Sequence, residues 1–164
     1  MRHETFMAVA HAVSQESKCV RLQVGSVLVK DGHIISSGYN GTAKGMPNCN
    51  EVVGIEIPIE DHHCWSQKHE IHSEMNCLLY CPVSTQGTTI YVTDSPCFNC
   101  TKHLIAAGVK EIYFDRMYDR YHRELKDEWQ EVLDTCTEAG VKLVQLKGNG
   151  YTLLTQKQHY RRQR

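Results

Sequence analysis

Two short motifs in the sequence contain residue types that can bind a transition metal and move a proton. The first is His-Ser-Glu at residues 72–74, and the second is Pro-Cys-Phe-Asn-Cys at residues 96–100. Zinc binds imidazole nitrogen and thiolate sulfur readily, and a catalytic zinc keeps a fourth position open for water. Glu74 is too close to the histidine to be expected as a second ligand, but it can face that water and shuttle its proton. The motifs therefore predict a hydrolytic zinc site with three ligands: His72, Cys97 and Cys100.

The alternative is a structural zinc knuckle in which Glu74 is an ordinary surface acid. The residues around the motifs favour the catalytic interpretation. Residues 88–93 are β-branched and apolar, which predicts a buried strand, and Pro96 then suits the first turn of a helix. Cys97 and Cys100 would lie one turn apart at that helix N-terminus, where the helix dipole favours thiolates. A second helical run follows His72, so two helix starts are expected to hold one metal between them.

Length and composition predict one domain over residues 1–164. The chain is 41% hydrophobic and has a net charge of −1, so it has no overall electrostatic attraction to nucleic acid. It contains no 18-residue apolar run that would predict a membrane span, and its first residues do not resemble a secretory leader. The eight cysteines are expected to be metal ligands and free thiols in a reducing cytosol, bacterial or phage-infected.

Hydrophobic periodicity predicts an alternation of helices and strands. We expect helices at 3–18, 75–80, after Pro96 and at 123–139, and strands at 22–30, 34–39, 88–93, 111–114 and 141–146. The turn at Asp31-Gly32 favours a hairpin, and the helix at 123–139 is a crossover of a length that suits parallel strands. The order predicts a three-layer α/β/α sandwich on a five-stranded mixed sheet. The tail at 148–164 is not assigned.

Several stretches resemble the cytidine-deaminase superfamily, and most closely the deoxycytidylate (dCMP) deaminases of phages and cells. They are Gly-Tyr-Asn-Gly at 38–41, residues 71–76 and residues 91–100, and the resemblance covers about residues 5–146. Ser73 and Cys77 stand where the family more often has alanine. The resemblance implies a cytidine-deaminase-like fold. It also implies zinc-dependent hydrolysis of dCMP to dUMP and ammonia, which supplies thymidylate synthesis.

The resemblance also implies roles for residues around the zinc. Glu74 would carry protons, Asn40 would contact the sugar, the backbone of Ser73 would contact the base edge, and Tyr118 would lie beside the substrate. A guanidinium group suits the substrate phosphate. The arginines flanking Tyr118 and the more distant Arg21 are all candidates for it.

A second set of metal-binding residues surrounds the long segment at 40–67. Some phage dCMP deaminases hold a second, structural zinc, and the matching positions here are Cys19, Cys49, His62 and Glu70. His63 or Cys64 could substitute for one of them. The alternative is that these are solvated loop histidines and a small buried cysteine. Metal ligation would anchor a long polar segment without an apolar core.

The resemblance further implies a homohexamer that is activated by dCTP and inhibited by dTTP. The expected effector contacts lie in a glycine-rich loop and comprise Gly38, Tyr39, Asn40, Gly41 and Lys44. In the alternative interpretation the glycines only turn the chain.

Two other functional classes are possible. A deaminase of tRNA or single-stranded DNA would need a basic groove with stacking aromatic rings, which the near-neutral charge and 8% aromatic content disfavour. A non-catalytic zinc-stabilised module would not need Glu74.

Overall fold

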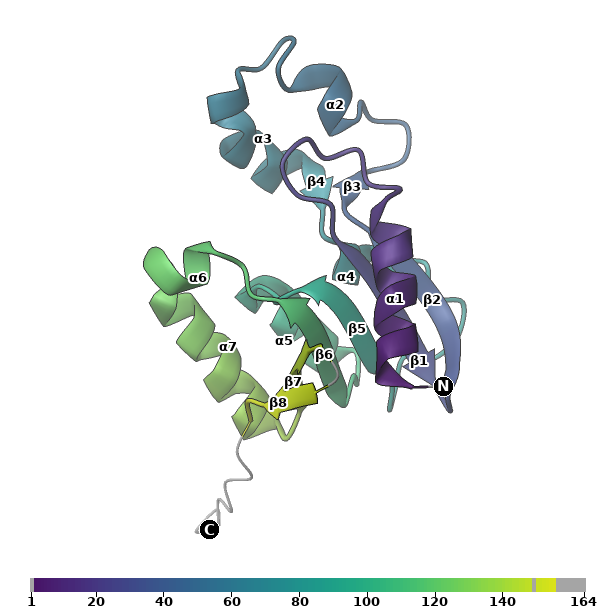
Figure 1. The fold of residues 1–164 in the computed structure, drawn as a ribbon. Helices are drawn as coiled ribbons and strands as arrows, with labels where there is room; N and C mark the ends of the chain where they lie inside the picture. Colours follow the sequence, from purple (N-terminus) through teal and green to yellow (C-terminus); the bar gives the residue numbers. More distant parts are fainter. Residues whose placement is uncertain (1, 149, 156–164) are drawn as a thin grey trace.

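The computed structural model describes residues 2–148 and 150–155, which form a mixed β-sheet with helices on both faces (Figure 1). The strands lie in the order β2-β1-β5-β6-β7-β8. β5, β6 and β7 are parallel, and the remaining pairs are antiparallel. The predicted parallel pair across the long helical crossover is therefore confirmed. The strand bounds are β1 Gly25–Lys30, β2 His33–Tyr39, β5 Thr89–Asp94, β6 Glu111–Arg116, β7 Lys142–Lys147 and β8 Gly150–Leu153.

The three-layer arrangement is confirmed by two separate cores on the two faces of the sheet. On one face, Phe6, Met7 and Ala10 of α1 (His3–Ser14) pack against alternate residues of β1, β5, β6 and β7. On the other face, the larger core lies under α4 (Ser73–Leu79), α5 (Phe98–Ala106) and α7 (Lys126–Ala139). Successive side chains along a strand point to opposite faces of the sheet, so each of these strands contributes residues to both cores.

The predicted count of five strands was one too few, because part of the tail joins the sheet. β8 pairs antiparallel with β7, with Gln145 opposite Thr152. Gly148, in the turn before β8, has a φ of 56°, a left-handed conformation that glycine adopts without strain. Every β8 side chain is exposed, so the strand had no apolar pattern from which to predict it. Residues 156–164, the rest of the predicted tail, lie outside the described residues.

Helices and strands also differ from the prediction near the N-terminus. α1 ends at Ser14 instead of residue 18, because the Ser17 hydroxyl donates to the carbonyl of Asn40 and turns the chain. β1 begins at Gly25 instead of residue 22. The Asn40 side chain accepts from the backbone N–H of Val24 and donates to the carbonyl of Leu22, so it occupies groups that a strand would use.

The segment from residue 43 to residue 69, called the 43–69 segment below, leaves and rejoins the sandwich at a two-stranded sheet. That sheet pairs β3 (Gly41–Thr42) with β4 (Glu70–Ile71). No helix was predicted between residues 40 and 67, but the segment contains α2 (Cys49–Val52), the 3₁₀ helix η1 (Ile59–Asp61) and α3 (His62–His69). It projects beyond the end of the main sheet (Figure 1). None of the helices in the described part of the chain is long and apolar enough to cross a membrane.

Candidate metal centre and active site

The structure brings together the three predicted catalytic ligands at the N-termini of two helices. Their donor atoms all lie within 4.8 Å of one another. His72 Nδ1 is 3.5 Å from Cys97 Sγ and 3.4 Å from Cys100 Sγ, so Nδ1 is the histidine atom that faces both sulfurs. Cys100 is buried, Cys97 is half-buried and His72 is exposed. The cluster is therefore open to solvent on one side, as a catalytic zinc with three protein ligands requires.

Helix capping places these residues. His72 is the N-cap of α4, and Cys97 is the N-cap of α5, where its sulfur accepts from the backbone N–H of Cys100. Pro96 precedes the N-cap and does not lie in the first helical turn as predicted. The difference follows from this bond, because a sulfur that caps the helix must stand just before its first residue.

The charges of the cluster suit a divalent metal. A hydrogen bond from the Cys100 thiol, together with the neighbouring His72 imidazolium, lowers the pKa of Cys97 to about 4. The same thiolate raises the pKa of His72 to about 9, and its hydrogen bond raises that of Cys100. A bound zinc ion would displace the protons of the second thiol and of the imidazolium, and two thiolates with one imidazole are donors that zinc prefers, so the residues fit this metal.

Glu74 follows His72 by two residues and is only 4% exposed. Burial raises the pKa of its carboxyl group, while the positive charge of His72 opposes the rise. The Ser73 hydroxyl donates to Glu74 Oε2 over 3.1 Å and also contacts the Ser26 hydroxyl of β1. The sequence had indicated a role for the backbone of Ser73 only. The bond from its side chain, and the part played by Ser26, had no signal in the sequence.

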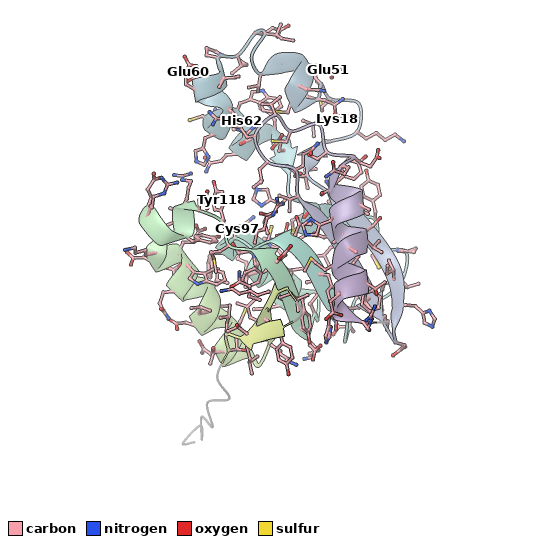
Figure 2. All side chains as sticks on the ribbon, viewed as in Figure 1. Lys18, Glu51, Glu60, His62, Cys97 and Tyr118 are labelled. Atoms are coloured by element: carbon pink, nitrogen blue, oxygen red, sulfur yellow. The ribbon has the colours of Figure 1, made fainter. Side chains whose placement is uncertain are left out.

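The two other predicted substrate residues, Tyr118 and Asn40, are held by different contacts. Tyr118 follows β6, and its backbone N–H donates to the Ser95 hydroxyl, two residues before Cys97. Figure 2 shows Tyr118 beside Cys97 and below the helix that carries His62. Asn40 is 6% exposed, and its amide already holds the backbone of Leu22 and Val24. Asn40 is therefore a structural clamp in this structure, and one amide hydrogen and one lone pair remain for a ligand.

The four residues predicted for a second metal also meet. Donor atoms of Cys19, Cys49, His62 and Glu70 lie within 4.8 Å of one another, with Cys19 Sγ 3.3 Å from His62 Nε2. Glu70 Oε1 is buried and has no hydrogen-bond partner, which is costly for a carboxylate unless a cation satisfies it. Two thiols, an imidazole and a carboxylate are donors that zinc accepts, so the residues fit a bound zinc ion. His63 and Cys64, the predicted substitutes, are exposed and lie outside this cluster.

Much of the segment predicted to bind effectors is strand. Gly38 lies in β2 against the start of α4, where a Cβ atom would come within 2.4 Å of the Ser73 carbonyl oxygen. This glycine is therefore required by helix–sheet packing and not by a flexible loop. Tyr39 ends β2 and Gly41 pairs with Ile71, whereas Lys44 lies in an exposed turn.

Comparisons with known proteins agree with this geometry. The deoxycytidylate deaminase of Enterobacteria phage T2 is 33% identical over 168 residues, covering 81% of this chain and 87% of that protein. ComE operon protein 2 of Bacillus subtilis is 38% identical over 131 residues, covering 77% of this chain and 66% of that protein. A crystal structure of dCMP deaminase from the cyanophage S-TIM5, in complex with dCMP and dUMP, is 29% identical. It superposes with a TM-score of 0.69 over 89% of this chain and 99% of that one.

The family description "Cytidine and deoxycytidylate deaminase zinc-binding region" matches residues 1–116, which include both helix N-termini of the metal centre. The chain therefore belongs to the cytidine and deoxycytidylate deaminase family.

Proposed function

We propose that this protein catalyses the hydrolytic deamination of dCMP to dUMP and ammonia. The observation that carries the proposal is the buried Glu74 carboxyl group beside an open cluster of one imidazole and two thiols. The names of the relatives, and the dCMP and dUMP bound to the cyanophage enzyme, support dCMP as the substrate.

Zinc held by His72, Cys97 and Cys100 would supply a water molecule that is nucleophilic at neutral pH. Glu74 removes a proton from the attacking water and gives it to the ring nitrogen next to the amine-bearing carbon. Glu74 then transfers the second proton to the departing amine, so that the C–N bond breaks and ammonia leaves. Burial raises the pKa of the Glu74 carboxyl group, so its carboxylate is a stronger base toward the water and the protonated group can donate in the later transfers. The Ser73 hydroxyl holds one carboxyl oxygen in place during both transfers.

The test is to incubate the zinc-loaded protein with cytidine, dCMP, dCTP and a cytosine-containing oligonucleotide, and to follow the change in ultraviolet absorbance. We expect turnover of dCMP well above that of the other three. Preferred turnover of the oligonucleotide would instead support a polynucleotide deaminase. No turnover of any substrate by protein with a full zinc site would support a non-catalytic module.

The second cluster supports a further part of the proposal, a structural zinc held by Cys19, Cys49, His62 and Glu70. Among the described residues, the local core has three buried hydrophobic members, Cys19, Cys49 and Val53, to which Ile57 and Trp65 add partial cover. So small a core gives little stability to the 43–69 segment, and a bound metal would supply the rest. Metal analysis of freshly purified, unchelated protein should give nearly two zinc ions per chain.

We also propose that the enzyme is a homohexamer regulated by dCTP as activator and dTTP as inhibitor. The pairing of β3 with β4 supports coupling, because Thr42 lies opposite Glu70, two residues before His72. A ligand on Gly41 or Lys44 would therefore act on a strand that reaches both clusters. Initial rates against dCMP concentration, with each effector added, test this. Hyperbolic curves of unchanged shape would refute regulation, and light scattering would give the assembly state.

A further inference from the structure

A line of three buried polar side chains runs from the main sheet to the carboxyl group of Glu74. Ser26 Oγ lies 2.5 Å from Ser73 Oγ, and the Ser73 hydroxyl donates to Glu74 Oε2 over 3.1 Å. Both serines are fully buried, and Glu74 is nearly so. Buried polar atoms need partners, and solvent has little access to supply them here. The three side chains therefore depend on one another for their hydrogen bonds.

Ser26 is the end of this line that the fold holds most firmly. It lies in β1 and pairs with Gly38 of β2 on one side and with Val92 of β5 on the other. Because Gly38 has no side chain, the first turn of α4 can lie close against the sheet at this point. The Ser73 hydroxyl is thereby brought to Ser26, and the sheet sets the place of the Ser26 hydroxyl.

The number of hydrogens gives the line a direction. A serine hydroxyl has one hydrogen to donate. Ser73 gives its hydrogen to Glu74 Oε2, so the hydrogen between the two serines belongs to Ser26. Within residues 2–148 and 150–155, the Ser26 hydroxyl has no second hydrogen-bond partner. If Glu74 donated to Ser73 and Ser73 to Ser26, the Ser26 hydrogen would be buried without an acceptor, which is costly.

We infer that Ser26 is a positioning residue, which acts through Ser73 to keep Glu74 Oε2 a hydrogen-bond acceptor and to leave Oε1 for the protons of the reaction. The reaction itself rests on the proposed function. A protonated oxygen is a weaker acceptor than a carboxylate oxygen. A proton on Oε2 would therefore weaken or reverse the bond from Ser73, whereas a proton on Oε1 leaves both serine bonds in place.

The proton transfers then pass through one oxygen. Oε1 of Glu74 takes the first proton from the attacking water and passes it to the ring nitrogen. It next takes the proton of the new hydroxyl group and passes it to the departing amine, so that ammonia leaves and Glu74 is again a carboxylate. Throughout, Oε2 stays bound to the Ser73 hydroxyl, and the carboxyl group keeps one orientation.

Ser36 shows what a serine with a structural role does in the same part of the fold. It is buried in β2, and its hydroxyl donates to the carbonyl of Cys77 in α4 over 2.6 Å. Ser36 therefore holds the same helix to the same sheet, but its bond ends on the backbone and not on the Glu74 carboxyl group. Ser36→Ala is the matched control for Ser26→Ala, because each variant loses a buried hydroxyl that joins the sheet to α4.

Steady-state kinetics with dCMP, at equal zinc content, tests whether Ser26 acts through Ser73. Ser26→Ala should lower kcat about two- to fivefold and leave KM unchanged, because it disturbs proton transfer and removes no contact with the substrate. The double variant with Ser73→Ala should be no slower than Ser73→Ala alone, because Ser26 has no effect once the intervening hydroxyl is gone. Ser36→Ala should lower the melting temperature and leave kcat unchanged.

A crystal structure of Ser26→Ala gives a readout that does not depend on turnover. The Ser73 hydroxyl should turn away from Glu74 Oε2 or occupy more than one rotamer, whereas Ser36→Ala should leave it in place. Retention of the bond from Ser73 to Oε2 without Ser26 would overturn the inference. Independent, multiplying effects of the two variants Ser26→Ala and Ser73→Ala on kcat would overturn it as well, and so would an unchanged kcat in Ser26→Ala. A wild-type protein that does not turn over dCMP refutes the proposed function instead, and the Ser73 rotamer then decides whether Ser26 positions this bond.

Discussion

The two cysteine-histidine clusters use similar ligands but have very different surroundings. His72, Cys97 and Cys100 stand at helix ends above the larger core of the sandwich, which includes Leu28, Ile90, Phe114 and Leu143. The second cluster lies beside a core of three buried residues, and two of these are its own cysteines. The packed sandwich therefore holds the first set of ligands in place. The second set of ligands has so little core around it that a bound metal would stabilise the local fold of the 43–69 segment. Loss of a ligand should then cost activity at one cluster and local structure at the other.

The largest expected effect separates chemistry from metal binding at the first cluster. Glu74→Gln keeps the size of the side chain and removes its proton transfer, so activity should fall about a hundredfold or more. Zinc content and melting temperature should stay the same, because Glu74 is not a ligand in the proposed site. Glu138→Gln, in an exposed part of α7, is the control. Near-normal turnover by a zinc-loaded Glu74→Gln variant would rule out the proposed mechanism.

The second prediction concerns the charge of the Cys97 thiol in protein whose metal has been removed with a chelator. The pKa of Cys97 is lowered from the ordinary 9.0 to about 4, so its thiolate persists above about pH 4 and is lost only as the pH falls through that value. Iodoacetamide at pH 6 should therefore modify Cys97 about tenfold or more faster than the exposed Cys64, even allowing for the lower nucleophilicity of an acidic thiol. Mass spectrometry of the labelled peptides measures both rates. Added zinc should protect Cys97, and equal rates at the two cysteines without zinc would contradict the assigned charges.

The third prediction concerns the second cluster. Cys49→Ala should reduce zinc from nearly two ions to one per chain and increase hydrogen exchange throughout the 43–69 segment. The sandwich should keep its protection, because its cores do not include Cys49. Cys64→Ala makes the same change at an exposed position of α3 and should leave both readouts unchanged. A single zinc ion per chain in the unchelated wild-type protein would refute the proposed structural metal and leave the catalytic proposal intact.

The smallest effect is expected for Ser73→Ala. The variant loses the hydroxyl that orients Glu74 but keeps the backbone and the metal ligands, so kcat should fall about two- to fivefold at constant zinc content. Ser37→Ala, at an exposed position of β2, is the control. Loss of zinc from Ser73→Ala would show that the hydroxyl supports the metal centre and not the carboxyl group.

The sequence predicted those parts of the molecule whose chemistry or periodicity is local. Strand β5 and the parallel β6–β7 pair follow from apolar runs and from the length of the crossover between them. The ligands of the first cluster follow from motif spacing. The exposed strand β8 has no apolar pattern, and the early end of α1 depends on a bond from Ser17 to the distant Asn40. The Ser26–Ser73 contact likewise joins residues far apart in the chain, which no local pattern reveals.

The pairing of Gly41 with Ile71 fixes the two ends of the 43–69 segment side by side. The segment therefore starts and ends at neighbouring strands. The number of residues in it does not change the distance between those two ends. Closure entropy rises only slowly with the number of residues in a loop, by about 0.6 kcal/mol for each doubling. Insertions or deletions between the helices of this segment should therefore leave the strand register of the main sheet unchanged. Evolution can resize this part of the molecule while the catalytic helices keep their places.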